Sequence, residues 1–163
     1  MIAVAMDPAD VKGFMNRLLR EDIMDEFEVR GVEMSLNTRI SINGALEATT
    51  SDENTDPNLE EKPKSLGHIS WEALRPLIFA IIKTGAKPKQ VKIVFSHKIQ
   101  KAKEIHQNAA ALFLNMIYEN DTVSFTTATS QKEFSLEKSL DDSWDKWVRD
   151  FFMQKNITVT DRE

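Results

Sequence analysis

The sequence predicts an α+β fold, in which an antiparallel sheet carries its helices on one face. Several segments alternate apolar and polar residues, as half-buried strands do, and short turns separate them. Other segments repeat apolar residues at spacings of three and four, as amphipathic helices do. The order strand, helix, strand, strand can be read twice along the chain, so two such units are an alternative to one sheet.

The first part of the chain predicts a strand, a helix and a hairpin. Residues 1–6 are expected to form a short strand. A helix should run from Pro8 to Arg20, because Asp7 can cap its first turn and proline suits the first helical position. In the two strands predicted between residues 27 and 42, the alternation changes phase at Gly31, which indicates a β-bulge.

Residues 47–66 interrupt this pattern. They are polar and acidic, with few large apolar side chains, which predicts a mobile acidic loop rather than a regular element. Such a loop could serve as a lid or a partner-binding arm, or it could be a tolerated surface insertion, since long polar loops cost little free energy.

The stretch of residues 68–85 is the most apolar of the chain and predicts a central helix. Ser70 is a suitable N-cap. Pro76 cannot donate a backbone hydrogen bond, so the first turn is either kinked or separate, with the main helix starting at Pro76. Phe79 widens the apolar face, and we expect this helix to be buried on more than one side. The face itself consists of Trp71, Leu74, Leu77, Ile78, Ile81 and Ile82.

The second half predicts further strands around a hairpin. Residues 90–96 and 112–118 read as strands, and residues 98–111 between them are moderately helical. Asn120-Asp121 is a short turn sequence, so residues 123–127 should return beside the preceding strand.

The C-terminal part predicts one more helix. A further strand could form at residues 133–136. The helix should run over residues 139–155, with Ser139 as an N-cap in a capping-box arrangement. We expect residues 1–156 to form a single domain and residues 157–163 to form a disordered tail.

Composition narrows the class of protein. The 163 residues are enough for one domain with a real core, and there is no cysteine, which excludes disulfides, thiol nucleophiles and cysteine-bound metals. The N-terminus lacks a signal-peptide pattern, and the apolar run 77–82 is far too short to cross a bilayer. We therefore expect a cytoplasmic protein without a membrane partner.

The net charge of −5 conceals a polarity along the chain. Residues 21–72 hold 13 acidic and 4 basic side chains, whereas residues 83–103 hold seven lysines and no acid. If these lysines share a face, they could bind the phosphates of DNA. The alternative is that they balance the acidic half, within the molecule or across an oligomer contact. The lysines are Lys83, Lys87, Lys89, Lys92, Lys98, Lys101 and Lys103.

No catalytic motif stands out. The five glycines are too scattered for a phosphate-binding loop, and the three histidines lack metal-ligand spacing, so no cofactor, metal or catalytic residue is predicted. The most suggestive pair is Trp71 and Arg75 beside Pro76, where the guanidinium could hold a carboxylate or phosphate with two hydrogen bonds.

The chain resembles an uncharacterised family of small proteins from Gram-positive, mostly clostridial-type bacteria, a domain of unknown function. The resemblance rests on Ile69-Ser-Trp with Arg75-Pro, Val91-Lys-Ile-Val-Phe, Phe113-Leu-Asn-Met-Ile-Tyr with Thr126-Thr-Ala-Thr-Ser, and Ser139-Leu with Trp144-Asp and Val148-Arg-Asp-Phe-Phe. It implies a bacterial, cytosolic, single-domain protein and assigns no ligand or catalytic residue. Separately, the doubled element order is similar to that of the DNA sliding-clamp fold.

The sequence thus favours a non-enzymatic binding or interaction module. Its partner could be another protein, a second copy of the chain, or DNA held in a clamp-like manner by the lysines of residues 83–103. The alternative is a domain or enzyme that takes a small anionic ligand near Trp71 and Arg75. A structural subunit is the third hypothesis.

Overall fold

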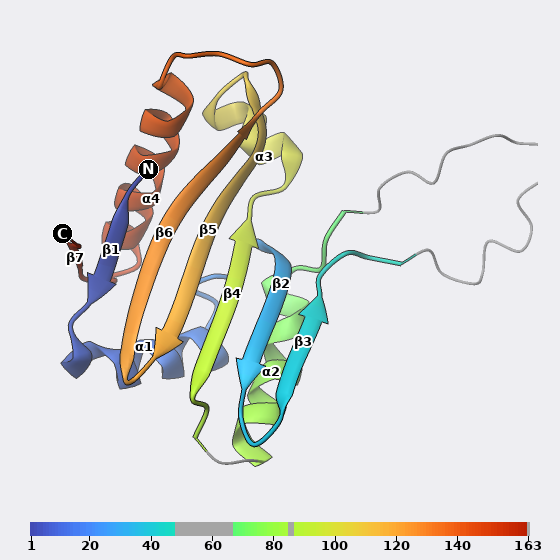
Figure 1. Ribbon diagram of the computed structural model, residues 1–163, viewed down its shortest axis with the longest axis vertical. Helices are drawn as coiled ribbons and strands as arrows, with labels where there is room; N and C mark the ends of the chain where they lie inside the picture. Colours follow the sequence, from blue (N-terminus) through green and yellow to red (C-terminus); the bar gives the residue numbers. More distant parts are fainter. Residues whose placement is uncertain (48–66, 85–86, 163) are drawn as a thin grey trace, which may run out of the picture.

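The computed structural model describes residues 1–47, 67–84 and 87–162, so nearly all of the predicted acidic loop lies outside the described residues. In this part of the chain, seven strands form one antiparallel sheet in the order β3-β2-β4-β5-β6-β1-β7 (Figure 1). The strands are β1 (Ala3–Met6), β2 (Glu28–Ser35), β3 (Arg39–Asn43), β4 (Gln90–Ser96), β5 (Ala109–Glu119), β6 (Thr122–Gln131) and β7 (Val159–Asp161).

Four helices pack against this sheet in the described residues, which confirms the predicted α+β class. The strands alternate buried and partly exposed residues, as a sheet covered on one face does. On β4, for example, Val91, Ile93 and Phe95 are buried in the core, whereas Lys92 lies on the open face. The helices are α1 (Pro8–Arg20), α2 (Trp71–Thr84), α3 (Ile99–Ile105) and α4 (Ser139–Gln154).

Several local predictions are confirmed. Helix α1 has the predicted bounds, and the Asp7 carboxylate accepts a hydrogen bond from the Ala9 amide at 2.9 Å. The register of β2 against β4 shifts between Val29 and Gly31, as the change of phase indicated. At the β5–β6 turn, Asn120 and Asp121 have positive φ angles of 52° and 59°, as a tight two-residue hairpin requires.

The central helix differs from its prediction in two ways. It begins at Trp71 and continues through Pro76, whose ring is exposed to solvent. It is also buried along one stripe only, formed by Trp71, Leu74 and Ile78, while Leu77 is 54% exposed. The prediction of burial on several sides was wrong because α2 lies at the margin of the helical layer, with α1 as its main helical neighbour.

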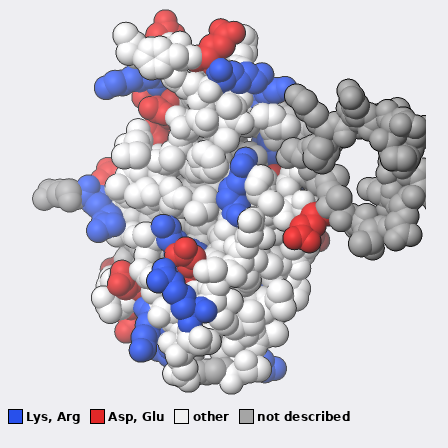
Figure 2. All heavy atoms as spheres, turned by 45° about the vertical axis from the view of Figure 1, so that its right-hand side comes forward, with Lys and Arg blue, Asp and Glu red and all other residues white. Residues whose placement is uncertain are grey.

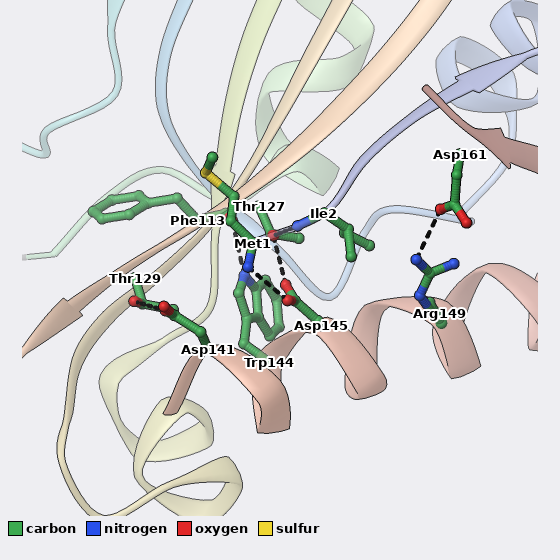
Figure 3. A network of polar contacts seen from close by, with 10 residues as sticks. All are labelled: Met1, Ile2, Phe113, Thr127, Thr129, Asp141, Trp144, Asp145, Arg149 and Asp161. Carbon is green, nitrogen blue, oxygen red and sulfur yellow. Dashed lines mark hydrogen bonds and ion pairs between the residues drawn. The ribbon is translucent and has the colours of Figure 1, made fainter. Parts of the chain in front are cut away.

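Polar contacts fix α4 to the sheet (Figure 3). The Thr127 hydroxyl donates to Asp145 at 2.6 Å, and the Thr129 hydroxyl donates to Asp141 one helical turn earlier. The indole N–H of Trp144 donates to the Phe113 carbonyl at 2.9 Å. Because these sheet groups belong to β5 and β6, the three hydrogen bonds set the position of α4 along the sheet as well as its distance from it.

The tail after α4 was expected to be disordered, and this was wrong for the described residues 157–162. Asn156 adopts a positive φ of 55°, the Ile157 amide donates to Phe152 at 2.8 Å, and the Asn156 amide donates to Met153 at 3.2 Å. These bonds form a Schellman motif, which ends the helix and reverses the chain. Ile157 then enters the core, and β7 pairs with β1.

The Schellman motif gives a stability prediction. Asn156→Ala should lower the free energy of unfolding by about 1 kcal/mol, because alanine tolerates the left-handed conformation less well than asparagine. Asn156→Gly should be neutral or stabilising, because glycine adopts this conformation without strain. Urea denaturation of both variants checks the prediction, and equal stability of the two would contradict it.

Two other segments were assigned wrongly from sequence. The helix predicted over residues 98–111 ends at Ile105, and its last residues begin β5 instead. The strand expected at residues 133–136 is a loop in the structure. In that loop, side chains rather than a neighbouring strand bind the backbone groups, as described below.

Candidate functional site

Trp71 and Arg75, the predicted ligand-binding pair, both have partners within the fold. Trp71 is fully buried, and its indole N–H donates to the Leu18 carbonyl at 3.2 Å. Arg75 binds Asp25 with two hydrogen bonds of 3.1 and 2.7 Å. This pairing raises the pKa of Arg75 and connects α2 to the turn after α1. A role of these residues in ligand binding stays a prediction.

The seven predicted lysines do not lie together. Lys89 precedes β4 and Lys98 follows it, so the length of the strand, about 20 Å, lies between them. Lys92 lies between them on the open face of the sheet, while Lys101 and Lys103 are on α3. Lys83 lies in the last turn of α2, and Lys87 is paired with Asp121. On the face shown in Figure 2, basic side chains stand in separate groups, several beside acidic ones.

A serine–histidine contact joins the start of α4 to the end of α3. His106 Nε2 lies 3.0 Å from the Ser139 hydroxyl oxygen, while His106 Nδ1 accepts a hydrogen bond from the Asn108 amide. In the neutral ring Nδ1 is therefore unprotonated and Nε2 carries the proton, so Nε2 donates to Ser139. A nucleophilic serine needs the opposite tautomer, in which Nε2 accepts its proton.

The start of α4 differs from its prediction. Ser139 is the first helical residue and not the N-cap. The N-cap is Lys138, whose side chain makes no capping hydrogen bond.

Residues 1–47, 67–84 and 87–162 contain no group of three or more histidine or acidic side chains that could hold a metal ion. Among the same residues no helix is long and apolar enough to cross a membrane.

The loop between β6 and α4, residues 132–138, is held in place by side chains at its base, and we call it the anchor loop. The Gln131 side chain donates to the Ser135 carbonyl at 3.1 Å and accepts from the Ser135 amide at 3.0 Å. Asn108 binds Glu133 in the same reciprocal way, at 2.9 and 3.0 Å. Backbone groups that a neighbouring strand would bind are thus satisfied by two amide side chains.

Two large apolar side chains project from the anchor loop. Phe134 is 87% exposed and Leu136 is 88% exposed. The residue between them, Ser135, is half-buried and bound to Gln131. Phe134 and Leu136 therefore flank a residue that faces the protein, and the ordered backbone presents both to solvent. Their alternation is visible in the sequence, but it also matches a half-buried strand, which is why sequence reasoning missed this feature.

An apolar groove lies between α1, the end of α2 and the β5–β6 hairpin. Its volume is about 500 Å³, within the range of small-molecule binding clefts. The apolar part of its lining consists of Pro8, Val11, Met15, Leu19, Ile82 and Pro88. The apolar residues of the groove can be read from the sequence. Only the packing of α1 against α2 shows that they surround one space.

Charged groups stand at the rim of this groove. Lys87 donates a hydrogen bond to Asp121, which also accepts from the Tyr118 hydroxyl at 3.2 Å. The contact between Lys87 and Asp121 raises the pKa of Lys87 and lowers the pKa of Asp121, so both stay charged at neutral pH. Lys12 on α1 also lines the groove, and it forms no ion pair with any described residue.

The anchor loop and the groove occupy opposite ends of the molecule. In Figure 1 the anchor loop passes over the top of the view, between β6 and α4. The β5–β6 turn and α1, which line the groove, lie at the bottom of the same view. Both features are apolar, and each stands beside charged side chains.

The model of a family of unknown function, DUF5721, matches residues 17–160. No curated protein and no solved structure matches the chain.

Proposed function

The chain belongs to the family DUF5721, whose function is unknown, and from this premise we propose that it is a non-enzymatic interaction module. Its contact site is the anchor loop, and its partner is another protein. The observation that carries the proposal is the exposure of Phe134 and Leu136, at 87% and 88%, on a backbone fixed by side-chain hydrogen bonds.

The free energy of side-chain burial supports the anchor loop as the contact site. Full burial of a phenylalanine or leucine side chain is worth about 1.5–3 kcal/mol relative to full exposure. The fold gains almost none of this free energy from Phe134 or Leu136, because both extend into solvent. The anchor loop is also ordered before any partner arrives, so binding would cost little conformational entropy. Aromatic anchors on rigid supports are typical centres of protein interfaces.

Two other functions have less support. Binding of DNA through the lysines of residues 83–103 would need a continuous basic surface, and the described lysines are spread over both ends of β4. An anionic ligand at Arg75 would have to compete with Asp25 for the guanidinium. The tautomer of His106 likewise gives Ser139 no general base, which supports the non-enzymatic part of the proposal.

The proposal predicts that the anchor loop can be changed without loss of stability. Replacing Phe134 and Leu136 together by serine should alter the free energy of unfolding by less than about 0.5 kcal/mol, because neither side chain is buried. Thermal or urea denaturation measures this. A large loss of stability would mean that the two side chains serve the fold instead of a partner.

Site-specific photocrosslinking tests the interaction itself. A photoreactive phenylalanine analogue at position 134, in the native host cell, should give a discrete adduct of higher mass. The matched control places the analogue at Met153, which is 72% exposed on α4 and outside the anchor loop. An adduct at position 134 and none at position 153 supports the proposal, whereas no adduct at position 134 overturns it.

A further inference from the structure

We propose that the groove of one copy of the chain receives the anchor loop of a second copy, so that the protein associates with itself through these two different surfaces. This inference rests on the proposed function and identifies the partner. It is carried by two independent features of the molecule, an apolar projection and an apolar recess. The elements that carry them lie at opposite ends of the fold (Figure 1).

The chemistry of the two surfaces matches. The projection offers one aromatic and one aliphatic side chain, Phe134 and Leu136. The recess is lined by aliphatic and proline side chains of α1, α2 and the segment before β4, including Met15, Leu19 and Ile82. These three side chains are only partly buried, so they have apolar surface left to cover. Contact between the two surfaces removes apolar area from water on both sides.

A charged contact can also form between the two surfaces. Glu133 and Glu137 immediately flank the apolar pair of the anchor loop, with Lys132 and Lys138 one residue further out. At the groove, Lys87 is paired with Asp121, whereas Lys12 has no acidic partner among the residues that the structure describes. When the anchor loop enters the groove, one of its carboxylates can approach the Lys12 ammonium group. Such pairs at the rim of an interface orient the partners and speed their encounter.

The positions of the two surfaces affect the form of the assembly. Each copy carries one projection and one recess, and the two are far apart. A copy that inserts its anchor loop into one neighbour keeps its own groove free for another. Contacts between unlike surfaces of this kind produce rings or open chains, whereas a twofold contact between like surfaces stops at a dimer.

Sedimentation of purified full-length chains tests the contact with three proteins. The loop variant carries Phe134→Ser and Leu136→Ser, and the groove variant carries Met15→Glu. The matched control carries Met153→Glu on the outer side of α4. The mass of the wild type and of the control should rise with concentration, whereas both test variants should associate at least about tenfold more weakly. Lys12→Glu is a second groove variant at an exposed position, in case Met15→Glu does not fold.

Mixing the two variants gives the decisive result. The loop variant retains an intact groove, and the groove variant retains an intact anchor loop. An equimolar mixture should therefore form a one-to-one complex, although each variant alone associates only weakly. A wild type that stays monomeric at the highest concentration, or a mixture without complex, overturns the inference.

The crosslinking experiment separates this inference from the proposed function. An adduct at position 134 with twice the mass of the chain supports both. An adduct with another protein, together with a monomeric wild type, overturns the self-contact and leaves the interaction module intact. No adduct at position 134 overturns both.

Discussion

Replacing Gly44 by alanine is expected to lower the free energy of unfolding by about 3 kcal/mol or more. A Cβ atom at this position would lie 1.8 Å from the carbonyl oxygen of Val29 and 2.7 Å from its carbonyl carbon. Both atoms belong to backbone, so no side-chain rotation can relieve the overlap. The chain after β3 must therefore move away from β2.

Gly44 cannot move alone, because it is hydrogen-bonded on two sides. Its amide donates to the Arg30 carbonyl at 2.9 Å, and its own carbonyl accepts from the Ile69 amide at 2.8 Å. A shift of Gly44 would strain both bonds and displace the extended segment that leads into α2. We thus expect the loss of stability to involve the margin of the sheet and the start of α2 together.

Gly13→Ala is the matched control, since it makes the same chemical change in open surroundings. No heavy atom outside its own helix lies within 4 Å of a Cβ at position 13. Alanine should stabilise α1 by about 0.5–1 kcal/mol, because glycine is a poor helix former. Urea denaturation of both variants measures the contrast, and a Gly44→Ala variant as stable as the wild type would contradict the prediction.

Acidification from pH 7 to pH 4 is expected to cost about 3 kcal/mol of stability through His97 alone. His97 is buried, and its Nε2 has no hydrogen-bond partner among the described residues. The ring stacks on Phe27 at 4.6 Å between centroids and meets the edge of Trp147 at 4.4 Å. Burial in these surroundings, with a smaller contribution from the charge of Lys101, lowers the pKa of His97 from 6.5 to about 4.

The direction of the effect follows from which state binds the proton. Between pH 6.5 and pH 4 the unfolded chain protonates His97 while the folded chain keeps it neutral, so stability falls as pH falls. The full loss is reached below pH 4, where both states are protonated. Because each tenfold difference in proton affinity is worth about 1.4 kcal/mol, the difference in pKa corresponds to about 3 kcal/mol.

His97→Leu and His97→Gln test this prediction, because neither side chain titrates in this range. Urea denaturation at several pH values between 7 and 4 gives the free energy of unfolding of each variant. Between pH 7 and pH 4 this free energy should fall by about 3 kcal/mol less in the variants than in the wild type. Some slope should remain, since burial also lowers the pKa of His68. The prediction is wrong if both variants lose stability with acid as steeply as the wild type.

Local elements of the fold could be predicted closely from the sequence. The bounds of α1 and β4 and the bulge near Gly31 were predicted correctly. Each of these features depends on signals within its own segment, such as a cap, an alternation or a change of phase. The wrong assignments, such as the disordered tail, concern segments whose structure depends on contacts with distant parts of the chain. The end of α4 contained a usable signal in Asn156, which favours the left-handed conformation, but β7 forms only because β1 is there to pair with it.

The sequence shows which residues make up the candidate site, but it does not show that they are exposed or lie together. Phe134 and Leu136 alternate like strand residues, and their exposure depends on Gln131 and Asn108 binding the backbone in place of a neighbouring strand. The groove exists only where α1 packs beside α2. Likewise, the hydrogen bond from Ile2 to Thr127 that ties β1 to β6 joins residues 125 positions apart.

The sequence by itself therefore determined the class of fold and most of its elements, because periodicity and caps act over a few residues. The tertiary structure decided that the strands form one sheet, that Trp71 and Arg75 have partners inside the fold, and that the lysines of residues 83–103 are dispersed. It also decided that an apolar loop and an apolar groove face solvent at opposite ends. These are questions of which distant surfaces meet, and no local pattern contains that information.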